Sequence, residues 1–154
     1  MAEKMMDAIS MLEQDHRKVE GLFKEFEGKG DRAAKAKMDL ARAISEELEV
    51  HTKLENEIFY PAAREVAEEM VAEAYEEHHV VDGILEEIGA MPEPNEQFDA
   101  KMLVLKEQIE HHVEEEEKEM FPKVKRGLGK ERMDQLGEQM MQRKQALMRE
   151  TRAA

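Results

Sequence analysis

Two halves of the sequence repeat one pattern of histidine and glutamate residues, and this repeat constrains the fold more than any other feature. In each half a lone histidine is followed by a histidine and a glutamate that stand four positions apart. The first copy consists of His16, His51 and Glu55, and the second consists of His78, His112 and Glu116. A proline then follows in each half, Pro61 in the first and Pro122 in the second. The repeat predicts two similar halves related by approximate twofold symmetry.

Apolar residues recur at alternating three- and four-residue steps in four segments, which is the spacing of helices that bury one face in a bundle. All six repeated residues fall within these apolar series. A histidine and a glutamate four positions apart lie on one face of a helix, so both reach the same interior region. A buried carboxylate is costly unless it is paired or bound to a metal. The sequence therefore predicts an all-α, up-down four-helix bundle with a metal site in its interior.

Glycines and prolines separate the predicted helices. Gly28-Lys-Gly-Asp31 and Pro92-Glu-Pro-Asn95 interrupt the periodic segments, and Asp31 and Asn95 are suited to cap the helices that follow them. Gly127-Leu-Gly129 precedes a shorter amphipathic segment in which Met133, Leu136, Met140 and Leu147 lie near one face. This last segment predicts an additional C-terminal helix.

The domain boundaries follow from these breaks. We predict a metal-binding four-helix domain over residues 1–126, built from two pseudo-repeats at about 5–65 and 66–126. We expect the C-terminal amphipathic helix, within 127–154, to cover the bundle or to help a dimer form. No chemistry is expected from it.

Charge and composition exclude several classes of function. The formal net charge is −14, which repels phosphate backbones and disfavours nucleic-acid partners. The chain has no Cys, so thiol catalysis and iron–sulfur clusters held by this chain are excluded. No segment approaches the roughly 18 consecutive apolar residues of a membrane span, and no signal peptide is visible. We expect a cytoplasmic monomer or homodimer with no membrane partner.

Two neighbouring histidines are assigned to the flank of the site. His79 and His111 each lie about 100° around the helix from the adjacent residue on the apolar face. The stretch that begins at His16 also aligns without a gap on His78, not on His79. Imidazole and carboxylate ligands together suit iron, manganese or zinc.

The sequence resembles hemerythrin-like proteins of the HHE cation-binding family over about residues 10–126. The residues that carry the resemblance are Asp15-His16, His51-Thr-Lys-Leu-Glu55, Phe59-Tyr-Pro61, Glu77-His78, His112-Val-Glu-Glu-Glu116 and Phe121-Pro122. The resemblance implies a non-haem centre of two iron ions, joined by an oxo or hydroxo bridge and by two carboxylates. The expected metal ligands are His16, His51, Glu55, His78, His112 and Glu116, with manganese or zinc as alternatives to iron.

The sequence departs from the oxygen-carrying members of this family. Those members have five histidine ligands, two of them one turn apart on the third helix. One turn before His78 this chain has Ala74, and one turn before His79 it has Tyr75. Two six-coordinate irons with the present ligand set keep two positions open rather than one. Tyr75 and His79 are the candidates for a supporting residue or an extra ligand there.

We therefore predict a di-iron-binding protein that binds or reacts with O2, NO or peroxide in sensing, storage or detoxification. One alternative is a di-iron enzyme of the peroxidase or nitric-oxide reductase type. Another is an iron-donating Fe–S repair factor, because the ligand set also resembles the di-iron domain of nitric-oxide-responsive repair proteins. Those proteins carry a Cys-containing N-terminal region, and this sequence has no Cys. A metal-free or zinc-stabilised bundle that acts through protein contacts is the third alternative.

Overall fold

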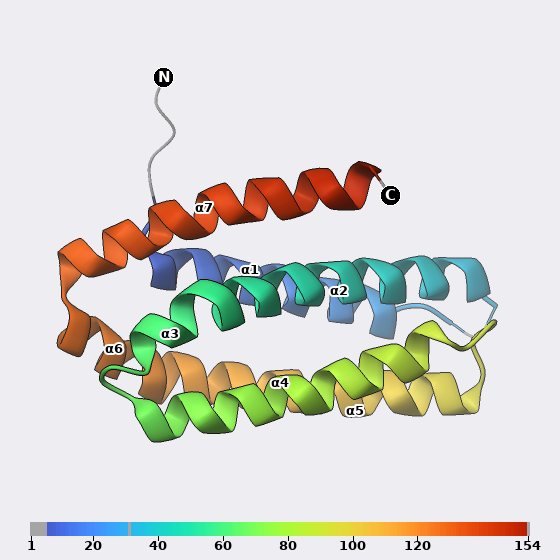
Figure 1. The fold of residues 1–154 in the computed structure, drawn as a ribbon. Helices are drawn as coiled ribbons and strands as arrows, with labels where there is room; N and C mark the ends of the chain where they lie inside the picture. The colour runs from blue at the N-terminus through green and yellow to red at the C-terminus, as the bar shows by residue number, and fades with distance from the viewer. Residues whose placement is uncertain (1–5, 31, 154) are drawn as a thin grey trace.

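Four long helices form a bundle, and a further helix lies against one side of it (Figure 1). The computed structural model describes residues 6–30 and 32–153. The bundle consists of α1 (Ala8–Glu27), α2 (Ala34–Leu54), α4 (Glu68–Gly89) and α5 (Glu96–Glu115). Helix α1 packs against α2 and α4 packs against α5, which gives two antiparallel layers. The described residues contain no strand, and the predicted up-down bundle is confirmed.

Side-chain caps fix the start of one helix in each half. The Asp7 carboxylate accepts a hydrogen bond from the Ser10 backbone N–H at 2.7 Å, at the start of α1. Asn95 Oδ1 accepts from the Phe98 N–H at 2.9 Å, so the predicted cap at Asn95 is confirmed. The other predicted cap, Asp31, lies outside the described residues.

The second helix of each half widens into a π-helix directly at the repeated glutamate. These segments are η1 (Glu55–Phe59) and η2 (Glu116–Met120), and they lead into the short helices α3 (Tyr60–Ala63) and α6 (Phe121–Leu128). Proline has no N–H, and its ring clashes with the carbonyl four residues before it in an α-helix. Pro61 and Pro122 are accommodated because the preceding turn is wider by one residue: the backbone N–H of the residue before each proline donates to the carbonyl of the glutamate.

A layer of buried polar side chains divides the interior into two apolar clusters. One cluster lies toward α3, α6 and the C-terminal helix and includes Leu12, Phe59 and Phe121. The other occupies the far end of the bundle and includes Val19 and Phe98. Apolar packing on both sides therefore holds the polar layer near the middle of the bundle.

The C-terminal helix α7 (Lys130–Ala153) runs along α1 and α2 (Figure 1). It has 24 residues and is longer than the sequence pattern suggested. Its apolar face is buried as predicted, through Met133, Leu136, Met140 and Leu147. At Gly137 an added Cβ would lie 2.3 Å from the Met6 carbonyl oxygen, so glycine permits this close crossing of α7 over the start of α1.

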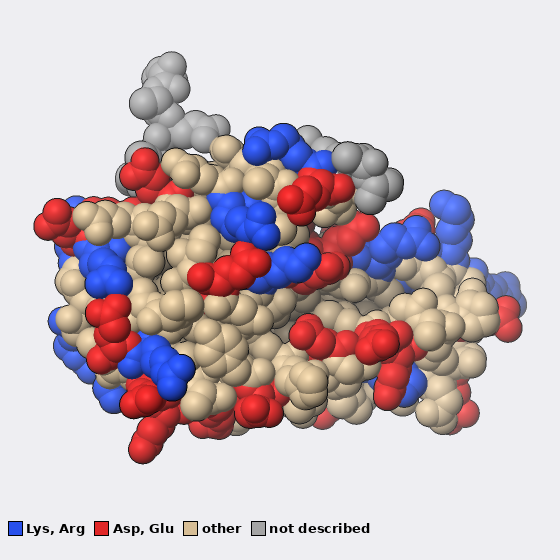
Figure 2. All heavy atoms as spheres, viewed as in Figure 1, with Lys and Arg blue, Asp and Glu red and all other residues tan. Residues whose placement is uncertain are grey.

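The surface is strongly charged. Figure 2 shows acidic and basic side chains interspersed over one face of the molecule. Among residues 6–30 and 32–153, each helix is too short or too polar to cross a membrane.

Candidate metal centre

All six histidine and glutamate residues of the repeat are buried and meet in the polar layer. They form two groups, and within each group one nitrogen or oxygen atom per residue lies within 4.8 Å of the others. The first group consists of His16, His51, Glu55 and Glu116, and the second of His78, His112 and Glu55. We call these groups the first and the second cation position. Glu55 belongs to both groups and therefore lies between the two positions.

Each glutamate approaches histidines from both halves of the chain. Glu55 Oε1 lies 3.1 Å from His51 Nε2 and 3.2 Å from His78 Nε2. The two oxygens of Glu116 divide between the groups: Oε1 lies 3.2 Å from His16 Nε2, and Oε2 lies 3.4 Å from His112 Nε2. Both carboxylates are thus placed to bridge two cations.

Several of these buried atoms form no hydrogen bond of regular geometry, and their polar neighbours are other atoms of the centre. They are His16 Nε2, His51 Nε2, both carboxylate oxygens of Glu55, and Glu116 Oε1. A buried polar group left unpaired costs about 1–3 kcal/mol. Cations bound here would satisfy these atoms and offset that cost. The donor set of imidazole nitrogens and carboxylate oxygens fits iron, manganese or zinc.

The outer nitrogen of each imidazole contacts a side-chain oxygen. The Nδ1 contacts are His16 to Glu117 at 2.7 Å, His51 to Asp15 at 3.0 Å, His78 to Asn56 at 2.8 Å and His112 to Glu77 at 2.7 Å. Carboxylate and amide oxygens are acceptors, so Nδ1 carries the hydrogen and Nε2 is left for a metal. Such contacts fix the tautomer and the orientation of a metal-binding histidine.

These outer contacts follow the internal repeat. The acid directly before each lone histidine, Asp15 or Glu77, holds the other histidine of the same half. The residue directly after each glutamate, Asn56 or Glu117, holds the lone histidine of the opposite half. The sequence analysis contained the neighbouring pairs but did not predict this crossed pattern.

Tyr60 is a member of the centre that the sequence analysis missed. Its side chain is fully buried, and its hydroxyl lies 3.1 Å from His78 Nε2 and 3.2 Å from His112 Nε2. The hydroxyl donates to Glu116 Oε2 at 2.6 Å. The phenol oxygen therefore lies within the second cation position. The available signal was a tyrosine directly before the proline in the first half, where the second half has Phe121.

Tyr75 and His79, which the sequence suggested as supporting residues or extra ligands, are not members of the two groups of possible ligands. The Tyr75 hydroxyl donates to the Asn56 backbone carbonyl at 3.3 Å, and its ring packs edge-on against Tyr60 with centroids 5.3 Å apart. Tyr75 thus supports the ring of Tyr60. His79 is exposed, as is His111.

Without a metal, two histidines of the centre, His51 and His112, have a raised pKa and hold their protons more tightly. Burial lowers the pKa of His51, but the charge of Glu55 and the hydrogen bond with Asp15 outweigh it and raise this pKa to about 10. Burial also lowers the pKa of His112. The charge of Glu116 outweighs this effect and raises the pKa well above its usual value. Burial and the nearby Glu116 charge raise the pKa of Tyr60, which keeps its phenol neutral. Metal binding would have to displace these protons.

A small enclosed cavity adjoins the histidines. Its volume is about 20 Å³, and it borders all four imidazoles together with apolar side chains that include Val19, Leu48, Val81 and Ile109. A cavity of this size has room for about one water-sized molecule.

The C-terminal helix also reaches the centre. Lys144 Nζ donates to Asp15 Oδ1 at 2.8 Å, and Asp15 is the partner of His51. The sequence analysis did not predict this contact, which places a positive charge of the C-terminal helix beside the partner of His51.

Comparisons with known proteins agree with this arrangement. The family model for the hemerythrin HHE cation-binding domain matches residues 7–124. A hemerythrin HHE cation-binding domain-containing protein from Mycobacterium kansasii has a similar solved structure, with a TM-score of 0.81 and 25% identity, covering 93% of this chain and 88% of that chain. A DNA nickase from Nostoc sp. is 27% identical over 131 residues, which is 84% of this chain. The match spans only 37% of the nickase.

Proposed function

Since the chain belongs to the hemerythrin HHE cation-binding domain family, we propose that it holds two iron ions and binds or reacts with a small ligand: O2, NO or peroxide. The observation that carries the proposal is that buried imidazole nitrogens and carboxylate oxygens gather at two adjoining positions, and that the Nε2 atoms of His16 and His51 and both oxygens of Glu55 form no regular hydrogen bond. Carboxylate-bridged metal pairs in helix bundles use the same kinds of ligand. Manganese and zinc are the alternatives that this donor set admits.

The proposed ligands divide between the two positions. At the first position they are His16, His51, Glu55 and Glu116, and at the second they are His78, His112, Glu55, Glu116 and Tyr60. Both glutamates would supply oxygen ligands to the two positions together. Bound iron would supply electrons and a coordination position for the external ligand. The protein orients the imidazoles through the acceptors at Nδ1 and keeps bulk water away with the two apolar clusters.

The open coordination position belongs to the first cation position in this proposal. Tyr60 and Phe121 stand at equivalent places in the two halves, each directly before a proline. The Tyr60 hydroxyl closes a position next to His78 and His112. Phe121 has no hydroxyl, and its ring stacks on His16 with centroids 6.0 Å apart and planes 5° from parallel. Phe121 therefore brings no oxygen ligand to its side of the centre, which is where we propose that an external ligand binds.

The size and lining of the enclosed cavity support a small ligand. About 20 Å³ admits a diatomic molecule or one of similar size, and excludes a metabolite. The apolar walls favour neutral species such as O2 and NO over charged substrates.

Anaerobic iron titration tests the proposal. Metal-free protein is titrated with Fe(II) and then exposed separately to O2, NO and peroxide, with optical spectra recorded throughout. We expect two irons per chain, with loss of iron in His51→Ala and Glu55→Ala and retention in the control His79→Ala. Far fewer than two metals in the unaltered protein would overturn the proposal and favour the metal-free bundle.

The same experiment separates binding from turnover. Recovery of the reduced spectrum when O2 is removed supports carriage or sensing. Many cycles of peroxide or NO consumption with an electron donor favour the enzymatic alternative instead.

The nickase activity of the longer relative is not part of this proposal. DNA binding depends on phosphate contacts from Lys and Arg. The net charge here is −14, and basic side chains such as Lys18, Lys101 and Arg132 pair with carboxylates.

A further inference from the structure

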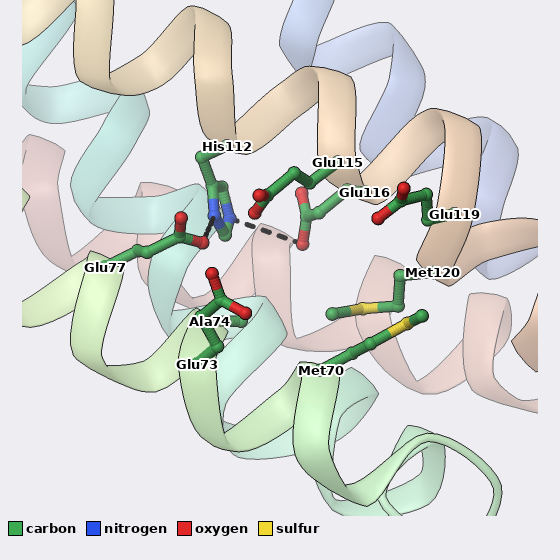
Figure 3. A pocket seen from close by; sticks show the side chains of 9 residues that line it. All are labelled: Met70, Glu73, Ala74, Glu77, His112, Glu115, Glu116, Glu119 and Met120. Carbon is green, nitrogen blue, oxygen red and sulfur yellow. Dashed lines mark hydrogen bonds and ion pairs between the residues drawn. The ribbon is translucent and has the colours of Figure 1, made fainter.

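A second cavity opens between α4 and the α5–η2 segment (Figure 3). Its volume is about 40 Å³. Glu73 and Glu77 line it from α4, and Glu115 and Glu119 line it from the opposite side. Among the described residues, no Lys or Arg lines this cavity. We call it the acidic cavity.

Glu77 and Glu115, which line the acidic cavity, form a cluster of possible cation ligands with the exposed His111, and we call this cluster the mouth of the cavity. One nitrogen or oxygen atom from each of Glu77, His111 and Glu115 lies within 4.8 Å of the others. His111 Nε2 lies 3.1 Å from Glu115 Oε1 and 3.9 Å from Glu77 Oε2. Gathered carboxylates create a negative potential that concentrates cations near a surface. An acidic cluster of this kind is common on surfaces and does not by itself define a site.

The inner wall of the cavity provides the second observation. The buried residues Glu116 and His112 also line it, and Figure 3 shows a dashed line between the His112 ring and the Glu116 carboxylate. Glu116 is 1% exposed, and its Oε1 has no hydrogen-bond partner. Both residues are proposed ligands of the buried centre. The acidic cavity thus leads from exposed carboxylates to the buried carboxylate of a proposed metal ligand.

The two cavities that adjoin the centre differ in lining. The enclosed cavity has apolar walls and little polar surface, which a hydrated cation would not enter. The acidic cavity has carboxylates, which are oxygen ligands that would replace the water molecules of a hydrated cation one at a time. Hard and borderline divalent cations accept such oxygen ligands readily.

We propose that the acidic cavity is the route by which a divalent cation of the Fe(II) class enters the buried centre. The Glu77–His111–Glu115 cluster is its first stopping point, and Glu116 receives the cation from there. This inference rests on the proposed function, because the route requires a metal destination.

The test measures the rate of Fe(II) uptake by metal-free protein, mixed anaerobically in a stopped-flow instrument with a coloured Fe(II) indicator. The double variant Glu73→Gln/Glu119→Gln removes two exposed carboxylates that line the cavity. We expect uptake to slow by about tenfold, in line with electrostatic steering. The final iron content and the spectrum should stay unchanged.

A matched control separates the route from general charge effects. Glu25→Gln/Glu86→Gln makes the same chemical change at exposed positions on α1 and α4, outside the acidic cavity. This control should load at the rate of the unaltered protein. Equal slowing in both double variants, or no slowing in either, would overturn the route alone. Absence of uptake by the unaltered protein would overturn the proposed function and the route with it.

His111→Gln tests the stopping point separately. In protein whose buried centre is already filled with iron, added Mn(II) should bind weakly at the mouth and be detected by its magnetic-resonance signal. The variant should lose this binding and keep its iron. Mn(II) binding that is absent, or that is equal in the variant, would contradict a cation site at the mouth.

Discussion

Tyr60 and Phe121 occupy equivalent positions at the ends of the two π-helices, and only Tyr60 places a hydroxyl within 3.2 Å of two imidazole nitrogens. The centre is therefore symmetric in its histidines and glutamates but unsymmetric in its phenol. The second cation position therefore has a phenol oxygen beside its histidines, and the first has none. Because only one position has a phenol, spectroscopy of the bound metal can distinguish the two positions.

Replacing Tyr60 by phenylalanine tests whether its oxygen is a ligand. We expect the iron(III) form of the unaltered protein to show a tyrosinate-to-iron charge-transfer band in visible and resonance Raman spectra. Tyr60→Phe should lose the band and keep most of its iron. Tyr75→Phe is the matched control, because Tyr75 contacts the Tyr60 ring and the Asn56 carbonyl instead. A band that survives in Tyr60→Phe would refute the assignment.

The reciprocal change tests where the external ligand binds. Phe121→Tyr introduces a hydroxyl beside His16, on the side that we propose to be open. We expect NO binding to the reduced protein to weaken by at least about tenfold, which corresponds to about 1.4 kcal/mol. Iron content should be unchanged. Unaltered NO affinity, measured by optical titration, would place the open position elsewhere.

The pKa of His51 predicts opposite pH trends for stability and for metal binding. It is about 10 in the folded, metal-free protein against 6.5 ordinarily, so its stabilising effect is complete below pH 6.5 and is lost as the pH rises toward 10. Urea unfolding of metal-free protein should therefore give a falling free energy of unfolding across this range. Metal affinity should rise over the same range, because the imidazole must lose its proton. Calorimetry in buffers of different ionisation enthalpy measures the protons released, and release of none would contradict the prediction.

Lys144 predicts a link between the C-terminal helix and the redox properties of the centre. Removing its charge in Lys144→Gln leaves Asp15 more basic and makes His51 a stronger electron donor. We expect a lower reduction potential for the bound iron, measured by potentiometric titration. Arg143→Gln is the control, since Arg143 pairs with Glu57 and not with Asp15. Equal shifts in both variants would point to a general charge effect.

Two glycines predict stability changes of opposite sign. Gly137→Ala would place a Cβ 2.3 Å from the Met6 carbonyl oxygen and 2.9 Å from the Asp7 backbone, so α7 must shift away from α1. We expect destabilisation by about 1–3 kcal/mol, as for other overpacked sites. Gly83→Ala, in the middle of α4 with open space around the new Cβ, should stabilise by about 0.5–1 kcal/mol. Thermal unfolding of both variants checks the contrast.

Sequence periodicity predicted the bundle, the cap at Asn95 and the apolar face of α7, because these features depend on local spacing alone. The same spacing predicted that His16, His51 and Glu55 would share an interior region with their counterparts. Their burial and proximity agree with that expectation, while their role as metal ligands stays a prediction.

The features that the sequence analysis missed depend on tertiary geometry. The π-helices arise where Pro61 and Pro122 meet a helix that continues instead of ending, and no local rule distinguishes the two outcomes. Tyr60 reaches the centre only because the widened turn precedes it. Lys144 lies far from Asp15 along the chain, so only the packing of α7 on α1 brings them together.

The central claim is tested most directly by a crystal structure of iron-loaded protein with anomalous diffraction recorded at the iron absorption edge. The account predicts two anomalous peaks per chain, one beside His16 and His51 and the other beside His78, His112 and Tyr60, with Glu55 between them. A single peak, no peak, or peaks remote from Glu55 and Glu116 would contradict it.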